Sequence, residues 1–140
     1  MDNILLNKAA IIERCLLRIH EEYANDPQNL RKNFTKQDSI ILNLERACEA
    51  SIDIAMHMVR KNKLGIPQDS RDSFDLLTKA KLIDQELSSN LNSMVGFRNI
   101  AVHDYQNINL DIVQAIIENR LKDLQKFAAW AIDQVQENNE

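Results

Sequence analysis

The chain has 140 residues, of which 44% are hydrophobic and 27% are charged, with only two glycines and two prolines. This length and balance predict one folded domain over residues 1–140 and exclude a disordered chain. The scarcity of glycine and proline disfavours turn-rich all-β folds and favours an all-α class. The net charge of -4 argues against broad, non-specific nucleic-acid binding, although it leaves room for a local cationic cleft.

The first amphipathic pattern predicts a helix over residues 3–24, which Pro27 terminates because proline disfavours helix at its own position and the one before it. The polar stretch 28–33 is expected to be a connection. Thr35 is expected to cap a second helix that runs to about Asn62. Both helices carry apolar residues at spacings of three and four. These are Leu5, Ala9, Ile12, Leu16, Ile19 and Tyr23 in the first, and Ile40, Leu44, Ala47, Ser51, Ile54 and Met58 in the second.

Three further helices are expected in the second half of the chain. Ser70 is the expected cap of a short helix over 71–81, Asp84 caps a fourth helix, and Asn109 caps a fifth over 110–136. No segment has the pattern of a strand. Amphipathic helices joined by short loops predict an antiparallel up-down bundle of four to five helices.

The two cysteines, Cys15 and Cys48, lie inside helical patterns. We expect buried thiols in a reducing compartment rather than a disulfide or a metal site. The N-terminus lacks the features of a signal peptide, and no apolar run approaches the ~20 residues that span a bilayer. A cytoplasmic protein with no membrane partner is therefore expected.

The apolar stripe of the fourth predicted helix places its next inward position at Arg98. A guanidinium on a packed face is costly unless it is paired or lies at a wet interface. His103 follows five residues later, and on a continuous helix two such side chains diverge by about 140° and are offset by about 7.5 Å. They converge only if the helix kinks or ends between Asn99 and His103, or if the residues of two subunits meet across a dimer.

Each of these residues also has a structural interpretation. Arg98 would pair with Glu49 of the second predicted helix, and a lone histidine such as His103 is more often a packing or surface residue than a catalyst. Asn99 would end a helix, and Tyr105 would lie at an interface. An arginine and a histidine five residues apart occur often by chance, so this spacing alone does not decide.

The functional interpretation joins the same residues in RNA cleavage. RNA carries its own nucleophile, the 2′-hydroxyl beside the scissile phosphate. Histidine suits the proton transfers because its ordinary pKa of about 6.5 lies near neutrality, and the arginine fork suits phosphate oxygens. The chemistry needs no metal. The three histidines are scattered, with no HExxH or CxxC pattern, so neither a metal nor another cofactor is expected.

The segment from Met94 to Tyr105 resembles the signature of the HEPN superfamily and, more narrowly, of the HepT-like toxins. The signature is an arginine, a polar residue, a few variable residues, a histidine, any residue and a tyrosine, and all of its fixed positions are present. Residues 37–50 resemble the second helix of the family, and residues 65–77 resemble its short middle helix. The likeness covers nearly the whole chain.

The resemblance implies a HEPN fold of four to five helices that forms a homodimer with a composite ribonuclease site. Arg98 would then stabilise the phosphorane, His103 would act as acid and base, and Asn99 would orient phosphate or His103. Glu49 and Asp104 are candidate supporting residues. The substrate would be RNA, with transfer RNA a plausible example.

The resemblance also implies a protein partner, an MntA-like minimal nucleotidyltransferase antitoxin that forms a hetero-oligomer with the toxin. Such an antitoxin transfers AMP from ATP to the motif tyrosine, which is Tyr105 in this chain. A bulky anionic adduct two residues from His103 would block RNA by its size and its charge.

Two alternatives remain open. The chain could be a non-catalytic substrate- or nucleotide-binding partner of a nucleotidyltransferase, in which Arg98 and His103 hold phosphate without chemistry. It could also be a purely structural helical dimer in which Arg98 pairs with Glu49. In that case Arg98→Ala would destabilise the fold by several kcal/mol, as breaking a buried pair can.

Overall fold

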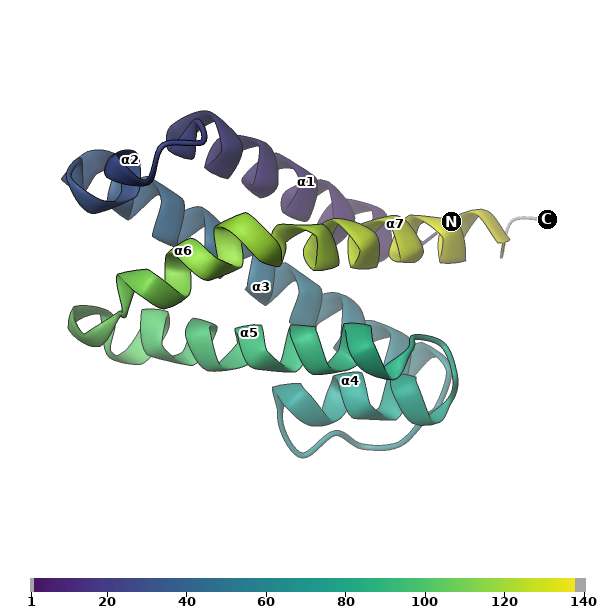
Figure 1. Ribbon diagram of the computed structural model, residues 1–140. Coiled ribbons are helices and arrows are strands. Elements are labelled where there is room, and N and C mark those ends of the chain that lie inside the picture. Colours follow the sequence, from purple (N-terminus) through teal and green to yellow (C-terminus); the bar gives the residue numbers. More distant parts are fainter. Residues whose placement is uncertain (1, 138–140) are drawn as a thin grey trace.

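The computed structural model describes residues 2–137, and every regular element in this range is a helix, which confirms the all-α class. The helices are α1 (Asn3–Tyr23), α2 (Pro27–Arg31), α3 (Phe34–Lys61), α4 (Ser70–Lys79), α5 (Gln85–His103), the short 3-10 helix η1 (Tyr105–Asn107), α6 (Leu110–Asn119) and α7 (Leu121–Glu137). The long rods alternate in direction: α1 and α5 run one way, and α3 and the α6–α7 pair run the other (Figure 1). This is the expected up-down bundle.

The core forms from the apolar stripes that the sequence predicted. All six stripe positions of α1 and all six of α3 are buried. The helix α3 packs against α1, α2, α4, α5 and α7, so it is the central scaffold on which α5 is positioned. Phe74 of α4 and Phe127 of α7 meet edge-to-face, with ring centroids 5.6 Å apart, and join the short helix to the bundle.

The helix α2 was not predicted, because Pro27 was interpreted only as a terminator. Proline is also favoured in the first turn of a helix, where its missing N–H costs no hydrogen bond. Asp26 caps this turn by accepting from the Gln28 N–H at 3.0 Å, and Leu30 anchors it in the core.

Two predicted caps were wrong by one or two residues. Asn33, not Thr35, caps α3 by accepting from the Lys36 N–H at 3.0 Å. Asp69, not Ser70, caps α4 by accepting from the Asp72 N–H at 2.8 Å. Ser, Thr, Asp and Asn are similarly good caps, so neighbouring candidates compete and local geometry selects one. The caps expected at Asp84 and Asn109 are confirmed.

The predicted helix over 110–136 is two helices that break at Arg120. The apolar spacing runs on from Ile117 to Leu121, so the sequence pattern does not mark the break. The helix α6 packs against α2, whereas α7 packs against α1, and the bend lets each half follow its own neighbour. This break and α2 account for seven α-helices in the described range instead of four to five.

Both cysteines are free and buried, as expected. Burial raises the pKa of the Cys48 thiol to about 12 and also raises that of Cys15, so neither sulfur is an active nucleophile. No helix in residues 2–137 combines the length and the apolar character needed to cross a bilayer.

Candidate functional site

Helix α5 runs without a break from Gln85 to His103, and the Asp104 N–H donates to the Ile100 carbonyl at 2.8 Å where it ends. A kink or an end between Asn99 and His103, one of the two arrangements that the sequence allowed, is therefore absent. Because five helical residues turn the side chain by about 140°, Arg98 and His103 point to different surfaces of the same rod. Arg98 faces α3 and α4, and His103 faces solvent.

Arg98 lies at the edge of the core, with 17% of its side chain exposed. One guanidinium nitrogen donates to the hydroxyl of Ser70 at 2.7 Å, and another lies 3.4 Å from a carboxylate oxygen of Glu49. The expected contact with Glu49 is thus present, but 48% of the Glu49 side chain is exposed, so the pair is not a buried one. The Nε of Arg98 is buried without a hydrogen-bond partner in the described residues. An incompletely satisfied guanidinium is more typical of a functional group than of a finished structural pair.

Asn99 and His103 share the exposed face of the last turn of α5. They are four residues apart, so their side chains are neighbours on the helix surface. This spacing places the amide of Asn99 within reach of the imidazole of His103. Asp104 ends the helix, and its two carboxylate oxygens accept from the Asn107 amide at 2.9 and 2.8 Å. Asp104 therefore holds the turn η1, which begins at Tyr105.

The side chain of Tyr105 is 43% exposed and reaches back to the start of α3. Its hydroxyl donates to a carboxylate oxygen of Asp38 at 2.6 Å. Partial burial, this hydrogen bond and the nearby charges of Asp38 and Glu45 raise the pKa of Tyr105 to about 12. The phenol is therefore neutral throughout the physiological pH range.

Arg71 is a residue of the site region that the sequence did not suggest. Its Nε donates to the carbonyl of Asn92 at 3.2 Å, so its guanidinium lies on α5. A Cβ built on Gly96 would come within 3.0 Å of the same guanidinium. One face of α5 carries residues at spacings of four and three, namely Asn92, Gly96, Asn99 and His103. Because Arg71 contacts the first two, it lies on the same face as His103. The signal in the sequence was a mid-helix glycine, which costs about 1 kcal/mol and often marks a close approach.

Two more arginines share a groove with Glu49. A groove of about 330 Å³ between α1 and α3 contains Glu49 together with Arg14 and Arg46. Neither Arg14 nor Arg46 has an ion-pair partner among residues 2–137. Local positive charge therefore exists close to Arg98 on a chain whose net charge is negative.

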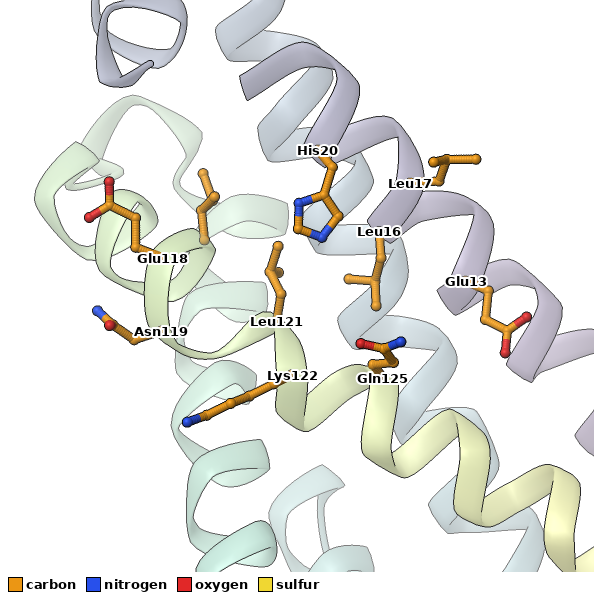
Figure 2. Close-up of a pocket in the computed structure, with 10 residues that line it drawn as sticks. Glu13, Leu16, Leu17, His20, Glu118, Asn119, Leu121, Lys122 and Gln125 are labelled. Carbon is orange, nitrogen blue, oxygen red and sulfur yellow. The ribbon is translucent and has the colours of Figure 1, made fainter. Parts of the chain in front are cut away.

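A further hollow of about 590 Å³ lies between α1 and the junction of α6 and α7. Figure 2 shows His20 pointing between Leu16 and Leu121, with Glu13 and Glu118 toward opposite sides. No residue of the segment 98–105 lines it, and its charged lining is mixed, with Lys122 beside the two glutamates. Among the described residues, no three His, Cys, Asp or Glu side chains are grouped so that they could hold a metal ion.

Comparison with known proteins gives a consistent match over most of the chain. A family model described as HepT-like, ribonuclease HepT-like, matches residues 12–130. A relative from Shewanella oneidensis, named mRNA nuclease HepT, is 55% identical over 127 residues, which cover 91% of this chain and 95% of the relative. A putative RNase from Archaeoglobus fulgidus is 30% identical over 88 residues, 63% of this chain and 66% of that protein.

Solved structures of related toxins have the same fold as this chain. The tri-AMPylated HEPN toxin of Shewanella oneidensis, in complex with MNT antitoxin, superposes with a TM-score of 0.86 at 54% identity, covering 93% of this chain and 97% of that one. A toxin–antitoxin structure with AMP-PNP gives a TM-score of 0.87 at 53% identity, covering 92% and 97%.

Proposed function

Because the chain belongs to the HepT-like family of ribonucleases, we propose that it is a metal-independent endoribonuclease toxin that uses Arg98 and His103 to cleave RNA. The supporting chemistry is simple. His103, exposed at the end of α5, exchanges protons with the 2′-hydroxyl or the leaving 5′-oxygen of the RNA. Arg98 places its positive charge beside the phosphorane, and Asn99 orients the neighbouring imidazole or the phosphate.

The observation that carries this proposal is the unbroken helix α5. Since Arg98 and His103 diverge on one rod, a site that uses both needs a second copy of the chain. The motif segment also carries three exposed apolar side chains, each at least 41% exposed: Ile100, Val102 and Tyr105. Grouped exposed apolar side chains are typical of protein interfaces, so they support a dimer interface at this segment. The homodimer would place the Arg98 of one protomer near the partner's motif and make the site composite.

The proposed regulator is an MNT nucleotidyltransferase antitoxin that binds the toxin and transfers AMP to Tyr105. Two features support this assignment. Tyr105 occupies the motif position of the tyrosine that the family resemblance makes the AMP acceptor, and the residue is 43% exposed. Its two-residue separation from His103 would bring the negative charge of AMP to the place where RNA phosphate must bind.

RNA cleavage by mixed dimers tests the composite site. Purified wild-type protein is expected to cleave messenger or transfer RNA in the presence of EDTA, while Arg98→Ala and His103→Ala are each slower by at least about 100-fold. When the two impaired variants are unfolded and refolded together, the heterodimers should cleave RNA faster than either variant alone. Each heterodimer retains one Arg98 on one protomer and one His103 on the other, which is enough for one composite site.

A mixture no faster than either variant alone, although native mass spectrometry shows heterodimers, would overturn the composite site. If the wild-type protein binds a nucleotidyltransferase but cleaves neither messenger nor transfer RNA, the result would support the alternative function, a non-catalytic binding partner of that enzyme.

Arg71 is expected to bind a phosphate of the RNA away from the scissile one, because it contacts α5 at Asn92 and Gly96, on the same face as His103. Arg71→Ala should raise KM about tenfold, equivalent to about 1.4 kcal/mol, and leave kcat nearly unchanged. For binding of single-stranded RNA by Arg71→Ala, the plot of log binding constant against log salt concentration should become less steep by about 0.7, the value for one lost phosphate contact.

Gly96→Ala provides the matched control for Arg71, since its methyl group would crowd the guanidinium at 3.0 Å while the charge is kept. It should raise KM and lower the salt slope less than Arg71→Ala does, because the contact is shifted rather than removed. An unchanged KM in both variants would contradict a phosphate contact at Arg71.

A further inference from the structure

The hydrogen bond between Tyr105 and Asp38 joins two elements that lie far apart in the sequence. Tyr105 begins η1, and Asp38 lies in the first turns of α3, 67 residues earlier. At 2.6 Å this contact is short and direct, and Asp38 is the only hydrogen-bond partner of the phenol among residues 2–137. Within residues 2–137, Asp38 makes no hydrogen bond or ion pair with Arg98 or His103, and the proposed RNA cleavage does not use it.

The contact matters because a neutral phenol is a weak nucleophile. With a pKa of about 12, only about one Tyr105 in 100,000 is ionised at pH 7. Partial burial and the carboxylates of Asp38 and Glu45 disfavour the free phenolate, so an ionised Tyr105 contributes almost nothing to the reaction at neutral pH. Modification then requires the proton to leave while the oxygen attacks.

We propose that Asp38 is the general base for the AMPylation of Tyr105, so that the toxin itself supplies a catalytic group for its own inactivation. The inference rests on the proposed function, which makes Tyr105 the acceptor of AMP. Because Asp38 already accepts the phenolic hydrogen bond, the proton has a defined destination before ATP arrives.

The step balances with ATP as the only co-substrate. The Oη of Tyr105 forms a bond to the α-phosphorus of ATP as the bond from that phosphorus to the β-phosphate oxygen breaks. Pyrophosphate leaves with the electron pair, and the phenolic proton passes to the carboxylate of Asp38 and then to solvent. The product no longer has a hydroxyl donor at Tyr105, and its phosphodiester carries a negative charge beside Asp38. The tether from η1 to α3 is therefore lost on modification.

The test measures the rate of AMP addition to purified protein, with ATP and the MNT antitoxin of the Shewanella oneidensis relative, by intact mass. Asp38→Asn keeps the size and an acceptor oxygen but removes the basicity. It should slow AMP addition at least about 100-fold at pH 7. Its rate should then rise about tenfold per pH unit, because modification now depends on the phenolate, whereas the wild-type rate changes less.

Glu45→Gln is the matched control, because it removes a nearby carboxylate that does not contact the phenol. Its rate should equal or exceed that of the wild type. Tyr105→Phe should gain no AMP, and thermal melting checks that each variant is folded.

The outcomes separate the two proposals. If the wild-type protein gains no AMP while the Shewanella oneidensis toxin does, or if Tyr105→Phe is still modified, the assignment of Tyr105 as the acceptor fails. If the wild-type protein is modified at Tyr105 and Asp38→Asn reacts as fast or faster, only the role of Asp38 fails.

Discussion

Replacing His103 with alanine is expected to abolish RNA cleavage while leaving the stability of the protein unchanged. The imidazole is exposed at the last residue of α5 and makes no hydrogen bond or ion pair with another side chain in the described range. Loss of a residue that exchanges protons with the reacting oxygens should lower kcat at least about 100-fold. Cleavage of RNA in EDTA and the melting temperature are the two measurements.

His20→Ala is the matched control for His103, since His20 is also an exposed helical histidine but lines the hollow between α1 and α7. It should cleave RNA at the wild-type rate. A His103→Ala protein that remains fully active would remove His103 from the chemistry, whatever its position in the motif.

Arg98→Ala is expected to lower kcat about 100- to 1,000-fold and to destabilise the fold by only about 1 kcal/mol. The small stability cost follows from the surroundings of the pair. Glu49 is about half exposed, so water solvates its carboxylate after the guanidinium is removed. Arg98→Lys should restore little activity, because an ammonium lacks the planar fork that binds two phosphate oxygens.

Glu49→Ala distinguishes the catalytic and the structural role of Arg98. If Arg98 acts on phosphate, this variant retains most of the cleavage activity, because the guanidinium is still held by Ser70. If the pair with Glu49 is structural, Arg98→Ala and Glu49→Ala should each lower the free energy of unfolding by several kcal/mol and by similar amounts, as measured by urea denaturation. That result, with cleavage intact in Arg98→Ala, would restore the structural interpretation.

The helix stripes were predictable because burial follows the 3.6-residue period. Positions such as Leu5, Ala9 and Ile12 recur on one face of a rod, and they are buried in the bundle. Helix ends were less predictable. Asn33 competes with Thr35, and Asp69 competes with Ser70, and each pair differs too little in capping strength for the sequence to select one. The choice at Asp69 has a consequence for the site, because it leaves the Ser70 hydroxyl available to Arg98.

The local pattern of the sequence therefore determined the all-α class, the buried faces of the helices and the segment from Arg98 to Tyr105 as a chemical anomaly. Each of these depends on residues within a few turns of one another. The tertiary structure alone decided that α5 continues unbroken to His103, so that Arg98 and His103 point apart. It alone brought Arg71 onto α5, and Asp38 to Tyr105 across 67 residues of chain. Contacts of this kind depend on how whole helices pack, and no local spacing in the sequence encodes them.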